Sequence, residues 1–302
     1  MGRAKMTVAA IDIGSNSVRL LVVGDDGSEI ARVTTVTALG MGLEQTGSFD
    51  AGAYDATVEA ITRYAATIAE FDVVEVKAVA TSASRDARNG AVLMADIGHL
   101  LGVEPVIIDG TREASLAFVG STRTLDTAGV KLVIDVGGGS TEFVYGVDTP
   151  SYDVSVDMGS VRLTDRCFDR RPATDDQVRR ARSEADTAFV SVVVGGDPTV
   201  AIGVAGTFAS LSAMALQLDT YDPDIVHGST LDLSVVSALV EWLSNLSVAE
   251  TAQIPSLDPA RARVILGGAI VVERALIHCG LESVMVSDRG LLDGLAFEGP
   301  TS

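Results

Sequence analysis

The first part of the chain alternates short apolar runs with longer stretches in which apolar residues recur at helical spacing. The short runs predict buried strands and the amphipathic stretches predict helices, because their periods match those two structures. Strands are predicted at 7–13, 18–24, 28–37, 73–80 and 103–108. Helices are predicted at 50–70, where Asp50 is the expected N-cap, at 85–101 and at 111–123. The resulting order of elements is βββαβαβα.

A similar order of elements starts again after residues 124–129. Strands are predicted at 131–136, 140–147, 152–156, 200–204 and 284–286, and helices at 160–168, 175–194, 208–218, 233–246, 261–278 and 290–297. Strands that alternate with helices predict an α/β layer fold. We therefore predict a duplicated α/β fold, with one domain over 1–124 and a second over 125–302. The last helix is expected to cross back onto the first domain.

Two turns, one in each half, share a sequence pattern. Residues 11–17 and 134–140 both fit Ile-Asp-(Ile/Val)-Gly-x-x-Ser, and each lies between two apolar strands. The matched positions are Asp12 and Asp135, Gly14 and Gly137, and Ser17 and Ser140, and Arg19 falls opposite Glu142. Two unrelated glycine hairpins would give the same local signal, but the match in the same strand–turn–strand context favours a duplicated unit.

These turns have the composition of phosphate-binding loops. Glycine turns leave backbone N–H groups open to a ligand, and several such groups can form an anion-binding nest. Strand–turn–helix segments at 81–84 and 206–207 add two more loops, and ligands of α/β folds gather at strand ends. The predicted phosphate ligands are Gly14, Ser15, Asn16, Ser17, Ser82, Gly137, Gly138, Gly139, Ser140, Thr141, Gly206 and Thr207. The acids Asp12, Asp135 and Glu142 beside them suit a hard cation such as Mg²⁺.

Composition narrows the range of partners. The net charge of −19 disfavours a nucleic-acid-binding surface, and it means that any polyanionic substrate must be captured by local arginines and a metal. Lys5, Lys77 and Lys131 are the only lysines, so the cationic chemistry belongs to arginine. Two cysteines and no signal peptide or membrane span predict a cytoplasmic protein. No P-loop lysine motif, metalloprotease motif or nucleophile elbow occurs.

Several stretches together resemble one family. Residues 10–20, 80–89, 110–116, 135–144 and 158–162 are similar to the exopolyphosphatase and guanosine pentaphosphate phosphohydrolase family, and the resemblance runs from about Val8 to Phe297. That family belongs to the actin-like ATPase superfamily, which has a ribonuclease H-like fold. The resemblance therefore implies two domains around a cleft, and metal-assisted release of a terminal phosphoryl group.

The resemblance also assigns roles to single residues. It implies Glu113 as general base, Asp135 and Glu142 as Mg²⁺ ligands with Asp12 adjoining, and Arg85 and Arg19 in phosphate binding. Many members carry Glu-Glu where this chain has Arg112-Glu113, so Arg112 is expected to contact phosphate or to form a surface salt bridge. Long members have further C-terminal helical domains, and their absence here favours short substrates.

These observations rank the functions. We expect a Mg²⁺-dependent exopolyphosphatase that prefers short inorganic polyphosphate. The nearest alternative is 5′-phosphohydrolysis of guanosine pentaphosphate. A small-molecule kinase of the same superfamily, and a non-catalytic sensor of guanosine penta- or tetraphosphate, are the other readings. No nucleic acid or membrane partner is expected, and a homodimer is compatible with the sequence.

Overall fold

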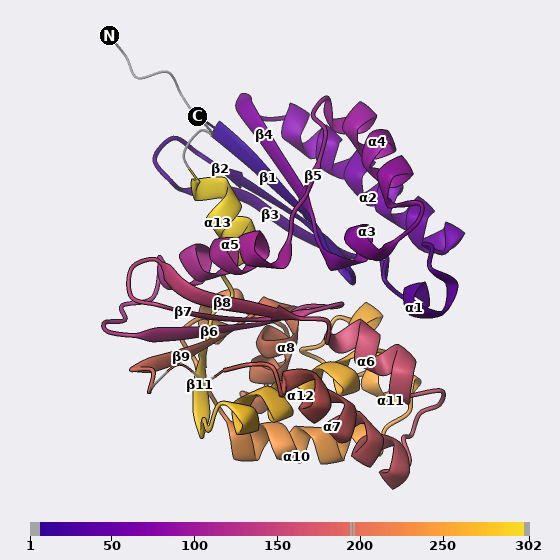
Figure 1. Cartoon of the computed structure of the whole chain (residues 1–302). Coiled ribbons are helices and arrows are strands. Elements are labelled where there is room, and N and C mark those ends of the chain that lie inside the picture. Colours follow the sequence, from indigo (N-terminus) through magenta and orange to yellow (C-terminus); the bar gives the residue numbers. More distant parts are fainter. Residues whose placement is uncertain (1–6, 194, 196, 299–302) are drawn as a thin grey trace.

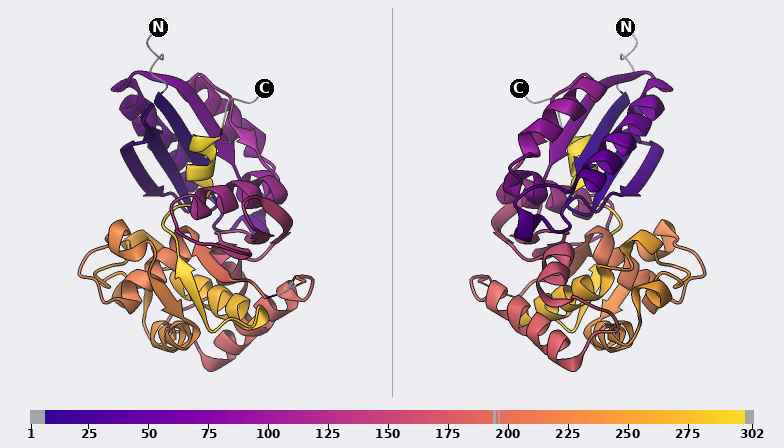
Figure 2. Two further views of the ribbon diagram at one scale, coloured as in Figure 1. Left: turned by 90° about the vertical axis from the view of Figure 1, so that its left-hand side faces the viewer. Right: turned by 90° about the vertical axis from the view of Figure 1, so that its right-hand side faces the viewer.

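The computed structural model describes residues 7–193, 195 and 197–298, which form two α/β units stacked on each other (Figures 1 and 2). The first unit contains a five-stranded sheet, called sheet A here. In spatial order its strands are β3 (Glu29–Val36), β2 (Ser17–Val23), β1 (Thr7–Ile13), β4 (Val73–Ala80) and β5 (Val106–Ile107). Strand β1 pairs antiparallel with β2 and parallel with β4. Because β1 lies between two neighbours, it is almost completely buried.

Four helices of the first unit precede β5. They are α1 (Leu43–Thr46), α2 (Ala51–Ala69), α3 (Ser82–Asp86) and α4 (Gly90–Leu101). Helix α2 begins after Asp50, whose side chain accepts hydrogen bonds from the N–H groups of Gly52 and Ala53. Side chains such as Ile61 and Leu93 from α2 and α4 join the strand residues in one apolar core.

The second unit repeats this plan in a six-stranded sheet, called sheet B. Its order is β10 (Thr230–Asp232), β11 (Ser283–Val286), β9 (Val200–Val204), β6 (Lys131–Val136), β7 (Thr141–Gly146) and β8 (Pro150–Val156). Strand β6 pairs antiparallel with β7 and parallel with β9, as β1 does with β2 and β4. Among the strands of the described residues, the edge strand β10 has no counterpart in sheet A. The predicted duplicated α/β fold is confirmed, because the five strands β3-β2-β1-β4-β5 correspond in order and direction to β8-β7-β6-β9-β11.

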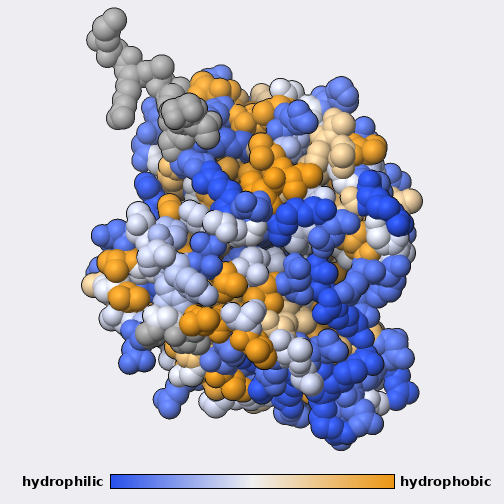
Figure 3. All heavy atoms as spheres, viewed as in Figure 1, coloured by the Kyte–Doolittle hydropathy of each residue, from blue (hydrophilic) through white to orange (hydrophobic). Residues whose placement is uncertain are grey.

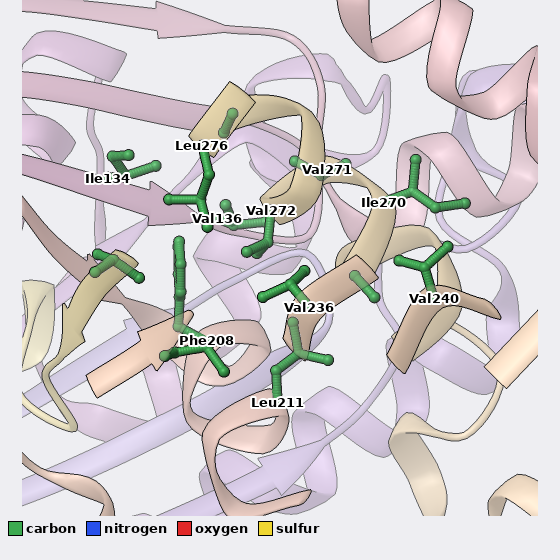
Figure 4. Close-up of a cluster of buried hydrophobic side chains, with 14 of the residues drawn as sticks. Ile134, Val136, Phe208, Leu211, Val236, Val240, Ile270, Val271, Val272 and Leu276 are labelled. Atoms are coloured by element: carbon green, nitrogen blue, oxygen red, sulfur yellow. The ribbon is translucent and has the colours of Figure 1, made fainter. Parts of the chain in front are cut away.

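Helices of the second unit enclose a larger core. They are α6 (Ser160–Cys167), α7 (Asp175–Phe189), α8 (Ala205–Ala215), α9 (Pro223–Val226), α10 (Leu233–Ser244), α11 (Val248–Thr251), the 3₁₀ turn η1 (Pro259–Arg261) and α12 (Ile265–His278). Figure 4 shows Phe208, Leu211, Val236 and Val272 in the same apolar cluster as Val136 of sheet B. Hydrophilic residues dominate the lower right of Figure 3, over α7 and its neighbours.

Two helices lie between the sheets, and each packs on the sheet of the other unit. Helix α5 (Gly110–Thr122) follows β5 of sheet A, yet Phe118 packs on Val144 of sheet B. Helix α13 (Leu291–Phe297) follows β11 of sheet B but lies beside sheet A (Figure 1), where Leu295 joins Leu21 and Val79 in one apolar cluster. The two helices cross very closely, because a Cβ on Gly120 would overlap the carbonyl oxygen of Gly290. Neither sheet is therefore covered by its own unit alone.

Some predicted elements differ from the structure. The helix predicted at 85–101 is two helices, because Ala87 is extended (φ −81°, ψ 130°) and the Asn89 side chain is hydrogen bonded to the backbone of Phe49. The helix predicted from 261 begins at Ile265 after the 3₁₀ turn, and the one predicted at 175–194 ends at Phe189. Residue 194 lies outside the described residues. In the described ranges, no helix is long and apolar enough to cross a membrane.

Candidate active site

The two glycine turns predicted from the sequence meet at the junction of the units. A Cβ on Gly138 would lie 2.8 Å from Ser15 Cβ, and a Cβ on Gly139 would overlap Ser82 Oγ. Ser15 and Ser82 share a hydrogen bond of 3.0 Å between their hydroxyl groups. Because any larger residue at 138 or 139 would push the units apart, glycine is required there for close approach.

Helix α6 determines the direction of the peptides in the second turn. The N–H groups of Ser160 and Val161 donate to the carbonyls of Gly137 and Gly138 over 3.0 and 2.8 Å. The Arg162 Nε donates to the Gly139 carbonyl over 2.9 Å. In a trans peptide the C=O and the following N–H point in opposite directions. The N–H groups of residues 138, 139 and 140 are consequently directed away from α6, as an anion nest requires.

The first turn is built in the same way. The Gly40 N–H donates to the Ser15 carbonyl over 2.6 Å, and the N–H groups of Thr37 and Ala38 both donate to the Asn16 carbonyl over 3.0 Å. Both turns are also closed by equivalent hydrogen bonds of 3.0 Å, from Gly14 N to Ser17 O and from Gly137 N to Ser140 O. The segment after β3 therefore orients the first turn as α6 orients the second.

Four carboxyl groups lie beside these turns. Asp12, Asp135, Glu142 and Glu113 are each less than one-tenth exposed. Asp135 faces Glu142 across the β6–β7 pair, and Ser155 donates to Glu142 over 2.6 Å. Glu113 lies in the first turn of α5 and pairs with Arg85 at 3.2 Å. The structure thus brings together the acids that the sequence predicted, although they come from both units.

Burial changes the acidity of this cluster. Desolvation raises the pKa of Asp135 to about 6, with a smaller opposing effect of Arg19. Desolvation and the charge of Asp135 raise the pKa of Glu142 to about 8. Desolvation, followed by the charges of Glu142 and Asp135, raises the pKa of Glu113 well above its ordinary value. Each of these acids responds to others in the group, so the carboxyls act as one electrostatic unit.

The donor set fits a hard divalent cation that binds together with substrate. Asp12 Oδ1 and Glu142 Oε2 are buried and, within the part of the chain that the structure describes, have no hydrogen-bond partner. No three acidic, histidine or cysteine side chains among the described residues are arranged to enclose a metal by themselves. Mg²⁺ commonly takes one or two carboxylates and completes its shell with water and substrate phosphate. Two orphaned carboxylate oxygens suit that mode of binding.

A cavity of about 480 Å³ opens beside the cluster, with Asp135 and Gly206 in its wall. It is lined by residues from both units, including four arginines: Arg19, Arg32, Arg261 and Arg289. Arg32 and Arg289 are paired with Glu29 or Asp293. Arg19 and Arg261 form no salt bridge with any described residue, so their charges remain available to an anion in the cavity.

Sequence reasoning missed Arg261. Its guanidinium lies against Gly206, where a Cβ would overlap it. Burial and then the charge of Arg19 lower the pKa of Arg261 to about 10, so it remains cationic at neutral pH. The sequence placed Arg261 at the start of a helix, whereas it ends the 3₁₀ turn after Pro259. Only Pro259, two residues before Arg261, could have indicated that a new element begins there.

Two predicted phosphate ligands use their hydroxyl groups elsewhere. Thr141 Oγ1 donates to the Met158 carbonyl over 2.5 Å, and Thr207 Oγ1 donates to the Val136 carbonyl over 3.3 Å. Arg112 pairs with Glu298, so the surface salt bridge is the alternative that the structure contains. Arg85 also donates to the Ile108 carbonyl over 2.6 Å, which fixes it next to Glu113.

Comparison with known proteins identifies the family, because residues 22–299 match the Ppx/GppA phosphatase family. The chain belongs to that family. It is 36% identical to Exopolyphosphatase 2 of Mycobacterium tuberculosis, covering 96% of this chain and 97% of that one. A solved exopolyphosphatase-like protein superposes with a TM-score of 0.92 at 33% identity, covering 97% of this chain and 98% of the other. The predicted family and the class of phosphatase enzymes are confirmed.

A relative of lower sequence identity is named for a guanosine phosphate. The Guanosine-5′-triphosphate,3′-diphosphate pyrophosphatase of Vibrio atlanticus is 27% identical over 96% of this chain and 58% of its own length. The chain is thus similar both to a protein named for polyphosphate and to a protein named for a guanosine phosphate.

Proposed function

We propose that this member of the Ppx/GppA phosphatase family is an exopolyphosphatase, which removes the terminal orthophosphate of inorganic polyphosphate with the help of Mg²⁺. The observation that carries the proposal is the meeting of two oriented N–H turns with four buried carboxyls and two unpaired arginines. Nests and arginines bind phosphate oxygens, and acids bind the cation that phosphate chemistry uses. The 36% identity to a mycobacterial exopolyphosphatase supports this substrate.

Glu113 is proposed as the base. Its raised pKa suits proton transfer near neutral pH, and the ion pair with Arg85 holds the carboxylate in place. Glu113 would take a proton from water while the water oxygen forms a bond to the terminal phosphorus. The bridging P–O bond breaks in line, and its electron pair leaves with the shortened polyphosphate.

The remaining residues bind charge. The N–H groups of the two turns would hold the terminal phosphate, while Arg19 and Arg261 would hold the following phosphates in the cavity. Asp135 and Glu142, with Asp12 adjoining, would hold Mg²⁺, which supplies neutralisation of the phosphate charge when bound. The preference for short chains, the cytoplasmic location, the homodimer and the two-domain division at residues 124–125 stay predictions.

A second candidate is 5′-phosphohydrolysis of guanosine pentaphosphate. The lining of the cavity of about 480 Å³ includes the apolar residues Pro223, Pro255 and Leu257 and the aromatic residue Tyr221. Polyphosphate has no apolar group for such residues, whereas a guanine base could pack on them. The guanosine phosphatase from Vibrio gives this candidate further support.

The test is phosphate release by the purified protein with Mg²⁺, from polyphosphate of defined length and from guanosine pentaphosphate. We expect kcat/KM to be higher on polyphosphate, and chelation of the metal to remove activity on both. A tenfold or larger preference for the nucleotide would reverse the ranking. Transfer of phosphate to an acceptor other than water would point to a kinase instead.

A further inference from the structure

Arg162 lies between the two units and contacts both. Its Nε donates to the Gly139 carbonyl over 2.9 Å, within its own unit. Its Nη2 donates to Asp86 of α3 in the first unit over 2.6 Å, and Nη1 lies 3.9 Å from Glu44 of α1. The side chain is only 16% exposed. One planar guanidinium therefore joins the second glycine turn to the first unit.

Arg162 holds the one peptide of the turn that the backbone does not hold. The carbonyls of Gly137 and Gly138 accept from backbone N–H groups of α6, which no side-chain change removes. The Gly139 carbonyl accepts from the Arg162 side chain. Since this carbonyl and the Ser140 N–H belong to the same peptide, Arg162 determines where the Ser140 N–H points.

The other end of this contact reaches the proposed base. Asp86 directly follows Arg85 in α3, and Arg85 pairs with Glu113 at 3.2 Å. The Asp86 side chain is 41% exposed, and an exposed ion pair adds little stability. The Arg162–Asp86 pair is therefore proposed to matter for geometry rather than for stability. It fixes the position of the second glycine turn relative to Glu113, the proposed base of the first unit.

We propose that Arg162 is a positioning residue that aims the Ser140 N–H at the terminal phosphate when the two units meet as they do here. The proposal rests on the function proposed above. It predicts that loss of the Arg162 guanidinium weakens phosphate binding and catalysis without unfolding the protein. One hydrogen bond to a charged phosphate oxygen corresponds to about a tenfold change or more.

Arg166 provides the matched control. It lies one turn further along α6 and also crosses the interface, where its Nε donates to Glu44 over 2.8 and 2.9 Å. It has no contact with the glycine turn among the interactions of the described residues. A variant at 166 removes a similar interface salt bridge and leaves the Gly139 peptide held.

The experiment compares Arg162→Gln, Arg162→Lys, Asp86→Asn and Arg166→Gln with the wild type. Binding of tripolyphosphate with Mg²⁺ is measured by calorimetry, and turnover by phosphate release. We expect Arg162→Gln to weaken binding about tenfold and to lower kcat/KM by about 10- to 100-fold, with Tm unchanged. Arg162→Lys, which keeps one donor, is expected to recover at least a third of the lost affinity, and Arg166→Gln to stay within twofold.

The double variant Arg162→Gln/Asp86→Asn tests the link between the units. If Asp86 acts through Arg162, the double variant loses no more than Arg162→Gln alone. Equal losses in Arg162→Gln and Arg166→Gln, or wild-type binding by Arg162→Gln, would overturn the proposal. The binding measurement tests the role of Arg162 even if the wild type binds tripolyphosphate without hydrolysing it. Binding without hydrolysis by the wild type would count against the proposed function but not against the role of Arg162.

Discussion

The two halves of the molecule have the same backbone arrangement at their glycine turns, but they differ in the charged residue that lies opposite the aspartate. The turns at 14–17 and 137–140 have equivalent hydrogen bonds, but Asp12 pairs in register with Arg19, whereas Asp135 pairs with Glu142. One acid is therefore beside a cation and the other beside a second acid. In the proposed mechanism the duplicated scaffold would provide two phosphate nests, with Arg19 contributing to anion capture and Glu142 to metal binding.

Glu113 belongs to the first unit in sequence but lies near the acids Asp135 and Glu142 of the second unit. Its substitution is therefore expected to have the largest effect on activity. Glu113→Gln keeps the shape and removes the base. We expect kcat to fall by about 10²- to 10⁴-fold while tripolyphosphate affinity stays within a few-fold. Steady-state phosphate release and calorimetry measure the two effects. Full activity in Glu113→Gln would remove the base assignment.

The two positions that differ between the turns should fail in different ways. Glu142→Gln is expected to lower kcat by about 100-fold and to reduce the Tm increase that Mg²⁺ gives with tripolyphosphate, because a cation ligand is lost. Arg19→Gln is expected to raise KM about tenfold with a smaller change in kcat, because it loses a charge-assisted contact. Identical effects in the two variants would contradict the division of roles.

The pKa values predict a dependence of stability on pH without metal or substrate. In the folded protein the pKa of Asp135 is about 6 and that of Glu142 about 8, both above the unfolded values of such groups. Between about pH 4.5 and 8 the folded state therefore binds more protons, and stability falls as pH rises. Urea unfolding at several pH values measures this fall. Glu142→Gln should reduce it, and an unchanged pH slope would show that Glu142 does not titrate there.

The smallest expected effect concerns the turns that follow the parallel strands. Ala80 of the first unit is still part of strand β4, whereas Ala205 at the equivalent register position, which follows the last paired residue of β9, has φ 70°. A non-glycine residue in that region costs roughly 1 kcal/mol. Ala205→Gly is expected to raise the free energy of unfolding by up to about 1 kcal/mol, measured in urea. A clear loss of stability would mean that the Ala205 methyl group packs usefully in the cavity wall.

The sequence predicted those features that depend on neighbouring residues. Alternation and apolar runs located the central strands, and the repeated pattern around Asp12 and Asp135 located both turns. It could not give Arg261 or the Arg162 contact, because their partners lie 55 and 76 residues away. The break between α3 and α4 was missed for the same reason, since Asn89 contacts Phe49 from another segment.

The packing of α13 on the sheet of the first unit has a consequence for folding during translation. Sheet A is made early, but the helix that covers one of its faces, Leu291–Phe297, is translated only after all strands of sheet B. Until α13 is made, apolar side chains of the first unit such as Leu21 and Val79 lack the packing that this helix provides. The first unit therefore completes its apolar packing only after the second unit has been synthesised, rather than independently during translation.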